Sequence, residues 1–145
     1  MKNLIVATDG SDSAMRAVVF AAQLATTFGA ELHLVTVAPH GGLVDDEPQA
    51  YARTEGITLN EALDAQSERI LGEATTQAQQ SGAAQFRTEM AIGDPAQEIL
   101  AIADREKADG IIVGKRGRGT LRAMLLGSVS HKLVALAQCP VIVVP

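Results

Sequence analysis

Short apolar runs alternate with longer stretches of helical periodicity along most of the chain. Many of the apolar runs, such as Ile111–Val113, are continuous, which is typical of strands that helices cover on both faces. The alternation predicts an α/β fold with a mainly parallel sheet. The expected strands are Leu4–Thr8, Leu32–Val37, Phe86–Ile92, Gly110–Gly114 and Val141–Val144.

The third of these runs differs from the others because its polar and apolar residues alternate. Phe86, Met90 and Ile92 share one side of the expected strand, together with the polar Thr88. Charged residues such as Arg87 lie between them and point to the opposite side. This pattern predicts a partly exposed strand at an edge of the sheet.

Capping residues indicate where the helices begin and end. Asp94 is a favourable N-cap, Pro95 suits the first helical position, and Gln97 is placed for a capping box. The stretch Ala38–Leu59 shows no regular pattern, and we expect a surface loop there. The predicted helices start after Ser11–Ser13 and end at Gly29, span about Asn60–Ser81, begin at Asp94-Pro95, and run from Gly127-Ser128 to near Gln138.

Length and charge narrow the class of protein. A chain of 145 residues fits one domain, which we expect to span residues 1–145. The net charge of −5 argues against nucleic acid as a partner. The apolar run at the N-terminus is too short for a signal peptide, and none approaches the roughly 18 residues of a membrane span. We therefore expect a cytoplasmic protein without membrane insertion.

Basic residues are concentrated in one part of this acidic chain. Five of the 12 lie between Lys115 and Lys132, among them Arg118 and Arg122, and no Asp or Glu follows Asp109. A basic segment without acidic residues is suited to binding a small anion. The alternative is a solvated basic loop without a ligand.

Two segments are placed to form a ligand site. In doubly wound sheets, ligands bind beyond the carboxyl ends of the strands, where the winding reverses. Thr8–Ser11 follows the first expected strand, and Gly114–Ser130 follows the fourth. If the strand order is 3-2-1-4-5, both segments line one crevice. Gly127-Ser128 leads into a helix whose free N–H groups would point at an anion, although a flexible loop with an ordinary cap is the alternative.

The glycine spacing of the second segment resembles a known signature. The spacing is similar to the G-2x-G-9x-G-[S/T] pattern of the universal stress protein family, in its ATP-binding branch. In this chain the pattern reads Gly114-x-x-Gly117, then nine residues, then Gly127-Ser128. The segments LIVATDGS, GDPAQEILAIA, LLGSVSHKL and CPVIVVP also resemble that family. The resemblance implies a Rossmann-like (adenine nucleotide alpha hydrolase-like) three-layer α/β/α domain with five parallel strands in the order 3-2-1-4-5.

The resemblance also implies a ligand and the residues that bind it. The ligand would be ATP, or ADP or AMP, with Mg²⁺ carried by the phosphates. For Asp9 the alternative role is helix capping, and for Arg116 it is that of an exposed basic residue. The implied contacts are Asp9 as a polar contact near the nucleotide, Ala7 and Thr8 beside the base, Val37 against adenine, Gly114 and Gly117 near ribose and phosphates, Arg116 supporting the loop or the phosphates, and Gly127, Ser128, Val129 and Ser130 around the phosphates.

Binding is favoured over catalysis by what the motifs contain. The chain has no P-loop, and His33, His40 and His131 have no metal-ligand spacing. We expect an ATP-binding stress sensor or regulator with at most slow ATP hydrolysis. Thr8–Ser13 partly resembles the SGGxDS loop of ATP pyrophosphatases, so an adenylating enzyme is one alternative, although Asp9 stands where that loop needs glycine. A nucleotide-free dimeric scaffold is another, against which the intact glycine signature argues.

The last expected strand, Val141–Val144, lies at an edge of the sheet in the order 3-2-1-4-5. It carries no charge, and its flanking prolines lie only at the ends. Because an exposed apolar edge favours association, we expect a homodimer joined through this strand. The alternative is an edge covered by a helix of the same chain. The partner protein that such a regulator would act on is not indicated by the sequence.

Overall fold

The computed structural model describes residues 1–39, 46–117 and 125–145. Its strands form one parallel sheet in the order β3-β2-β1-β4-β5, which confirms the predicted fold. The strands are β1 (Asn3–Ala7), β2 (Glu31–Ala38), β3 (Phe86–Ile92), β4 (Gly110–Gly114) and β5 (Val141–Val144). The helices are α1 (Asp12–Phe28), α2 (Asp46–Glu55), α3 (Leu59–Gln80), α4 (Pro95–Glu106) and α5 (Ser128–Leu136).

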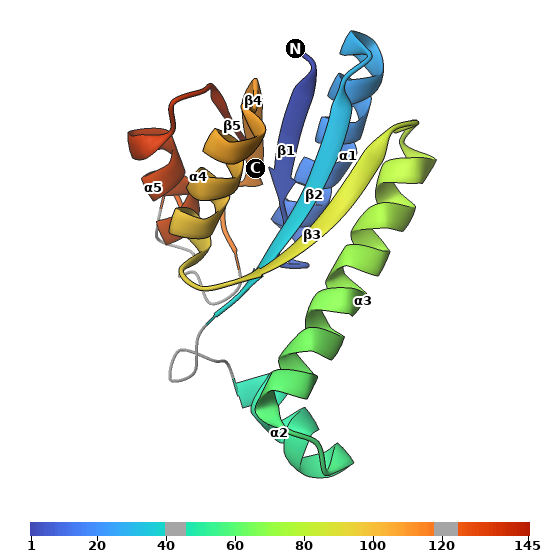
Figure 1. Ribbon diagram of the computed structural model, residues 1–145, viewed down its shortest axis with the longest axis vertical. Coiled ribbons are helices and arrows are strands. Elements are labelled where there is room, and N and C mark those ends of the chain that lie inside the picture. The colour runs from blue at the N-terminus through green and yellow to red at the C-terminus, as the bar shows by residue number, and fades with distance from the viewer. Residues whose placement is uncertain (40–45, 118–124) are drawn as a thin grey trace.

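The sheet is the middle layer of three (Figure 1). Helices α1 and α3 cover one face, and α4 and α5 cover the other. Alternate side chains of the central strands therefore enter two different cores: Leu4 and Val6 pack against α1, whereas Ile5 packs on the α4 side. None of the helices among the described residues combines the length and the apolarity needed to cross a bilayer.

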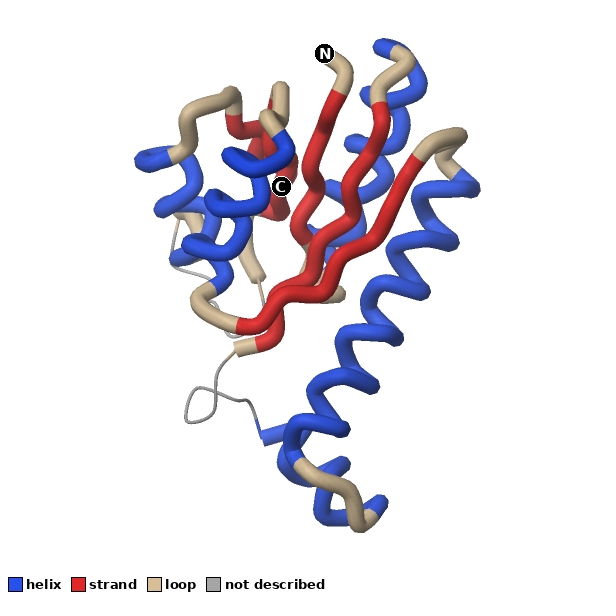
Figure 2. Tube along the Cα trace, viewed as in Figure 1, coloured by secondary structure: helices blue, strands red, loops and turns tan. Residues whose placement is uncertain are grey.

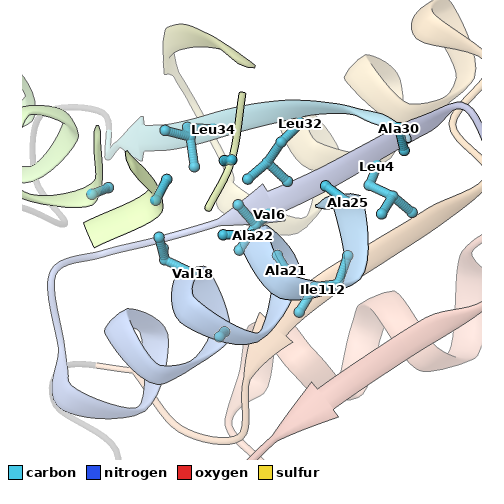
Figure 3. Packing of buried hydrophobic residues seen from close by; sticks show 14 of the residues in the cluster. Leu4, Val6, Val18, Ala21, Ala22, Ala25, Ala30, Leu32, Leu34 and Ile112 are labelled. Carbon is cyan, nitrogen blue, oxygen red and sulfur yellow. The ribbon is translucent and has the colours of Figure 1, made fainter. Parts of the chain in front are cut away.

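Small side chains bring α1 close to the sheet. Ala21, Ala22 and Ala25 face the leucines, Val6 and Ile112 of the central strands in Figure 3. Fifteen buried residues make up this aliphatic cluster. Burial of apolar surface contributes about 25 cal/mol per Å², so this tight layer stabilises the sheet in which β1 and β4 pair side by side.

Strand β3 lies at the edge, as its alternating pattern predicts. The apolar side of β3 is nevertheless largely open to solvent: the side chains of Met90 and Ile92 are 46% and 59% exposed. The reason is that α3 packs on β2 and diverges from β3 toward the end of that strand (Figure 2). The opposite, charged side of β3 faces α4.

The prediction of irregular structure from Ala38 to Leu59 is wrong in its second part, where α2 forms. Helix α2 buries only Pro48 and Ala52, so its sequence has no apolar stripe that would reveal it. It is held by packing against α3, with acidic residues in its first turn. The first part of the predicted loop, with His40 and Asp45, lies outside the described residues.

The predicted helix boundaries are otherwise close to those observed. Ser11 caps α1, Gly29 ends it in the left-handed conformation with φ of 62°, and Asp94 caps α4 ahead of Pro95. Helix α5 ends at Leu136, earlier than the predicted Gln138. Its C-cap residue is already extended, and the approaching proline disfavours further helical turns.

Candidate functional site

The loop after β1 is ordered by its own short side chains. Thr8 is buried, its N–H donates to the carbonyl of Val35 at 2.9 Å, and its hydroxyl accepts from the N–H of Gly10 at 3.1 Å. Asp9 Oδ1 accepts from the N–H of Ser11 at 2.9 Å, which closes a turn that Asp commonly forms. The N-cap of α1 is Ser11 rather than Asp9, so the Asp9 carboxylate remains beside the switch point.

Two glycines, Gly114 at the end of β4 and Gly117 in the loop that follows, lie close to the loop after β1 and the first turn of α1. A Cβ at Gly114 would lie 2.7 Å from the backbone nitrogen of Ala14 and 2.8 Å from Ser13 Oγ. A Cβ at Gly117 would collide with Oδ2 of Asp9. Side chains at positions 114 and 117 would therefore push the end of β4 and its following loop away from Asp9 and the first turn of α1. Glycine at both positions allows this close approach.

Helix α5 begins at this same point without a side-chain cap. Its N-cap is Gly127, which has no side chain to accept a hydrogen bond from the first turn. The first helical bond joins the N–H of His131 to the carbonyl of Gly127 at 3.0 Å. The N–H groups of Ser128, Val129 and Ser130 precede that bond, so they belong to the donors that an α-helix leaves open at its start.

Ser130 holds the start of α5 against the glycine loop. Its side chain is only 2% exposed, and Oγ lies 3.0 Å from the carbonyl oxygen of Lys115 and 3.1 Å from that of Gly127. The N–H of Gly127 donates to the same Lys115 carbonyl at 2.8 Å. The Ser130 hydroxyl is therefore turned toward carbonyls, which leaves the backbone N–H of Ser130 among the open donors of the helix start.

A cavity opens between these segments. Its empty space amounts to about 630 Å³, a volume that includes space open to solvent. Every residue that the sequence implied as a ligand contact lines it: Ala7, Thr8, Asp9, Val37, Gly114, Arg116, Gly117, Gly127, Ser128, Val129 and Ser130.

Sequence reasoning missed five apolar residues of the lining. Val35 and Val113 lie near the carboxyl ends of β2 and β4, so their neighbours in sequence could have indicated them. Pro95 and Ile99 come from α4, and only the packing of α4 on the sheet brings them to the cavity. Ala14, from the first turn of α1, completes the wall.

Arg116 supplies the positive charge of the described lining. It is half-buried, and its Nε is buried without a hydrogen-bond partner among the described residues. An unmatched donor on a cation is costly unless a ligand or water meets it. Of the other basic residues of this segment, Lys132 lies 3.8 Å from Asp94, and Arg118 and Arg122 are outside the described residues.

The chemistry available is that of anion and planar-ring binding. Asp9 is the one carboxylate in the lining that the structure describes. Among residues 1–39, 46–117 and 125–145, no group of three His, Cys, Asp or Glu side chains could hold a metal ion. The cavity thus combines backbone donors, one guanidinium and an apolar wall.

A doubly wound parallel sheet with a glycine-lined cavity at its switch point defines a three-layer α/β/α domain of the Rossmann-like type. The model of the universal stress protein family matches residues 1–145, and the chain belongs to that family.

Relatives support this assignment along the whole chain. The universal stress protein MJ0531 of Methanocaldococcus jannaschii is 34% identical over 145 residues, covering 99% of this chain and 81% of the relative. The universal stress protein of Archaeoglobus fulgidus in complex with dAMP is 25% identical, with a TM-score of 0.73 and coverage of 100% of this chain and 98% of that one. A universal stress protein in complex with cAMP is 30% identical, with a TM-score of 0.70 and coverage of 99% and 95%.

Proposed function

We propose that this chain binds an adenine nucleotide, ATP first of all, and acts as a nucleotide-dependent sensor or regulator of the ATP-binding branch of its family. The observation that carries the proposal is the start of α5, where an uncapped helix faces a cavity lined by Gly114 and Gly117. Solved relatives with dAMP and with cAMP point to the same class of ligand.

The phosphates would lie at the N-terminus of α5. Backbone N–H groups of Ser128, Val129 and Ser130 would donate to phosphate oxygens, and the helix dipole would favour the negative charge. The unmatched Nε of Arg116 would meet the same anion. Because the described part of the chain offers no cluster of metal-ligating side chains, Mg²⁺ would be held mainly by phosphate oxygens.

The adenine ring would occupy the apolar part of the cavity. Val35 and Val37 from β2, Val113 from β4 and Ile99 from α4 provide a wall suited to a flat ring. Asp9 also lines the cavity, beside Gly117, where a carboxylate can accept hydrogen bonds from ribose hydroxyls or from the exocyclic amine.

The lining favours binding over turnover. A general base for hydrolysis needs a carboxylate or imidazole within reach of a water, and Asp9 already accepts the N–H of Ser11. We therefore expect at most slow ATP hydrolysis. An adenylating enzyme would instead release pyrophosphate when given ATP and an acceptor, and a nucleotide-free scaffold would show no binding.

Isothermal titration calorimetry with ATP, ADP, AMP, dAMP and cAMP tests the proposal. Wild type should bind ATP, and Gly117→Val should weaken binding at least about tenfold because its side chain would strike Asp9. Gly72→Val is the matched control, since a Cβ at Gly72 on α3 meets nothing within 4 Å and lies away from the cavity. Absence of binding to wild type at millimolar nucleotide would refute the function, and full binding by Gly117→Val would refute the site.

We further propose a homodimer joined through Val141–Val144 of β5. All four residues are only partly buried at the edge of the sheet, so no described helix of the chain covers them fully. The carbonyl of Val144 accepts the N–H of Lys115 at 2.6 Å and the hydroxyl of Ser13 at 3.0 Å, which ties β5 to both cavity loops. Light scattering at micromolar concentration should give the mass of a dimer, and a monomer would contradict the proposal.

A further inference from the structure

His33 is a buried imidazole that the nucleotide site does not use. It lies in β2, between Ile5 of β1 and Arg87 of β3 in register, and is only 4% exposed. Its Nε2 lies 3.0 Å from Oε2 of Glu89. Its Nδ1 is buried and has no hydrogen-bond partner among the described residues.

Charged groups surround this ring from the neighbouring elements. Glu89 of β3 also accepts from Arg105 of α4 at 2.7 Å, and Arg105 in turn donates to Glu106 at 2.7 Å. Arg87 of β3 bridges Glu106 at 2.5 Å and Glu31 of β2 at 2.9 Å. On β1, the neighbour of the ring is the apolar Ile5. The cluster therefore joins the last turn of α4 to the edge of the sheet.

The neutral form of His33 fits this environment. Burial lowers the pKa of His33 below 6.5, and the nearby Arg87 lowers it further, against the opposing effect of Glu89. With one proton, Nε2 donates to Glu89 and Nδ1 keeps a lone pair that needs no acceptor. A second proton would place an ionic donor on Nδ1, where the described structure offers no acceptor.

We propose that His33 is an acid-sensitive switch for the packing of α4 on the sheet. When the ring gains its second proton it leaves the interior, and the last turn of α4 loosens from β2 and β3. The cavity would respond, because α4 also supplies Pro95 and Ile99 to its wall, and Val35 follows two positions after His33 on the same face of β2. This last consequence rests on the proposed nucleotide site.

The sign of the effect follows from the direction of the shift. Because the folded pKa of His33 lies below 6.5, the unfolded or locally opened state binds more protons just under that pH. Stability of the α4 contact is therefore complete above 6.5 and falls as the pH drops toward the folded pKa. As the pH drops, the equilibrium constant for local opening can rise by up to about tenfold per pH unit, which is the limit for uptake of one proton.

Hydrogen exchange at about pH 7.5 and about pH 5.5 tests the switch within the intact protein. After correction for intrinsic exchange rates, amides of α4 should lose protection in acid, whereas those of α1 on the opposite face should not. His33→Gln keeps a donor for Glu89 but cannot titrate, so its α4 protection should not change with pH. An equal loss in both helices, or the same loss in His33→Gln, would overturn the proposal.

A titration of wild type by NMR gives a second test, in which the His33→Gln variant serves only to assign the signal. Of the three imidazoles, the one missing in spectra of His33→Gln is His33, and it should titrate below 6.5. Titration at or above that value would overturn the switch. ATP affinity should fall in acid for wild type and less for His33→Gln. If wild type binds no ATP at either pH, the proposed function fails, and hydrogen exchange still decides the switch.

Discussion

The first turns of α3 and α5 differ in how their backbone N–H groups, which have no partner within the helix, are satisfied. At α3, Thr58 and Glu61 cap each other: Thr58 Oγ1 accepts the N–H of Glu61 at 3.1 Å, and the Glu61 carboxylate accepts the N–H of Thr58 at 2.8 Å. At α5, Gly127 provides no side-chain acceptor. The first start is closed within the chain, and the second leaves its donors open beside the cavity.

Helix α5 therefore lacks the stabilisation that a side-chain N-cap would provide. A Ser, Thr, Asp or Asn cap is worth about 1 kcal/mol over alanine and a few tenths over glycine. Space is not what excludes such a residue, since a Cβ at Gly127 would meet its nearest neighbours at 3.4 Å, an ordinary contact. An open helix start next to Arg116 makes sense when an anion serves as the cap.

The strongest test of this comparison is to close the α5 start with a carboxylate. Gly127→Asp should weaken ATP binding about a hundredfold, or ~2.7 kcal/mol, because its carboxylate would occupy the donors and repel the phosphates. Without nucleotide the variant should be slightly more stable, by a few tenths of a kcal/mol. Calorimetry and urea unfolding measure the two effects. Unchanged ATP affinity would show that phosphates do not bind at α5.

A comparison of Gly114 with Gly127 distinguishes a glycine required by close packing from one that leaves a helix start open. Gly114→Ala should lower the free energy of unfolding by about 2 kcal/mol, because its Cβ would press on the backbone of Ala14 at 2.7 Å. Gly127→Ala should cost clearly less. Urea unfolding of both variants makes the comparison, and equal losses would mean that Gly127 is also held by packing.

The closed start of α3 should matter for stability alone. Thr58→Ala removes the acceptor for the N–H of Glu61, so the free energy of unfolding should fall by about 1 kcal/mol. ATP affinity should remain that of wild type, since Thr58 does not line the cavity. A change in ATP affinity measured by calorimetry would break the distinction between the two helix starts.

The smallest expected change in stability comes from a substitution at the C-terminal end of α4. Lys107 ends α4 with φ of 51°, a left-handed conformation that glycine adopts at less cost, as Gly29 does at the end of α1. Lys107→Gly should therefore stabilise the protein by about 0.5 kcal/mol in thermal unfolding, with ATP binding unaffected. A loss of stability would indicate that the Lys107 side chain contributes contacts that outweigh its backbone conformation.

Much of the sheet and of the cavity could be predicted because both are encoded locally. Continuous apolar runs marked β1 and β4, and the spacing from Gly114 to Gly127 marked the segment between β4 and α5. The residues that the resemblance implied line one cavity, since each lies near or just after the carboxyl end of a strand or at the start of a helix.

What could not be predicted depends on contacts distant in sequence. Helix α2 has too few apolar residues to show a period, and it exists through packing on α3. Ile99 reaches the cavity only because α4 lies on the sheet. The environment of His33 likewise requires Glu89 and Arg105, which are far along the chain, so the sequence around His33 did not indicate it.

The central claim is that the open start of α5 receives the phosphates of an adenine nucleotide. The most direct measurement is a titration of the ¹⁵N-labelled protein with ATP, followed through the amide signals of both helix starts. The account predicts that Ser128, Val129 and Ser130 shift strongly together with Gly117, while Leu59 to Glu61 at the start of α3 stay unchanged. Saturating shifts elsewhere with none at Ser128–Ser130, or no shifts at millimolar ATP, would contradict it.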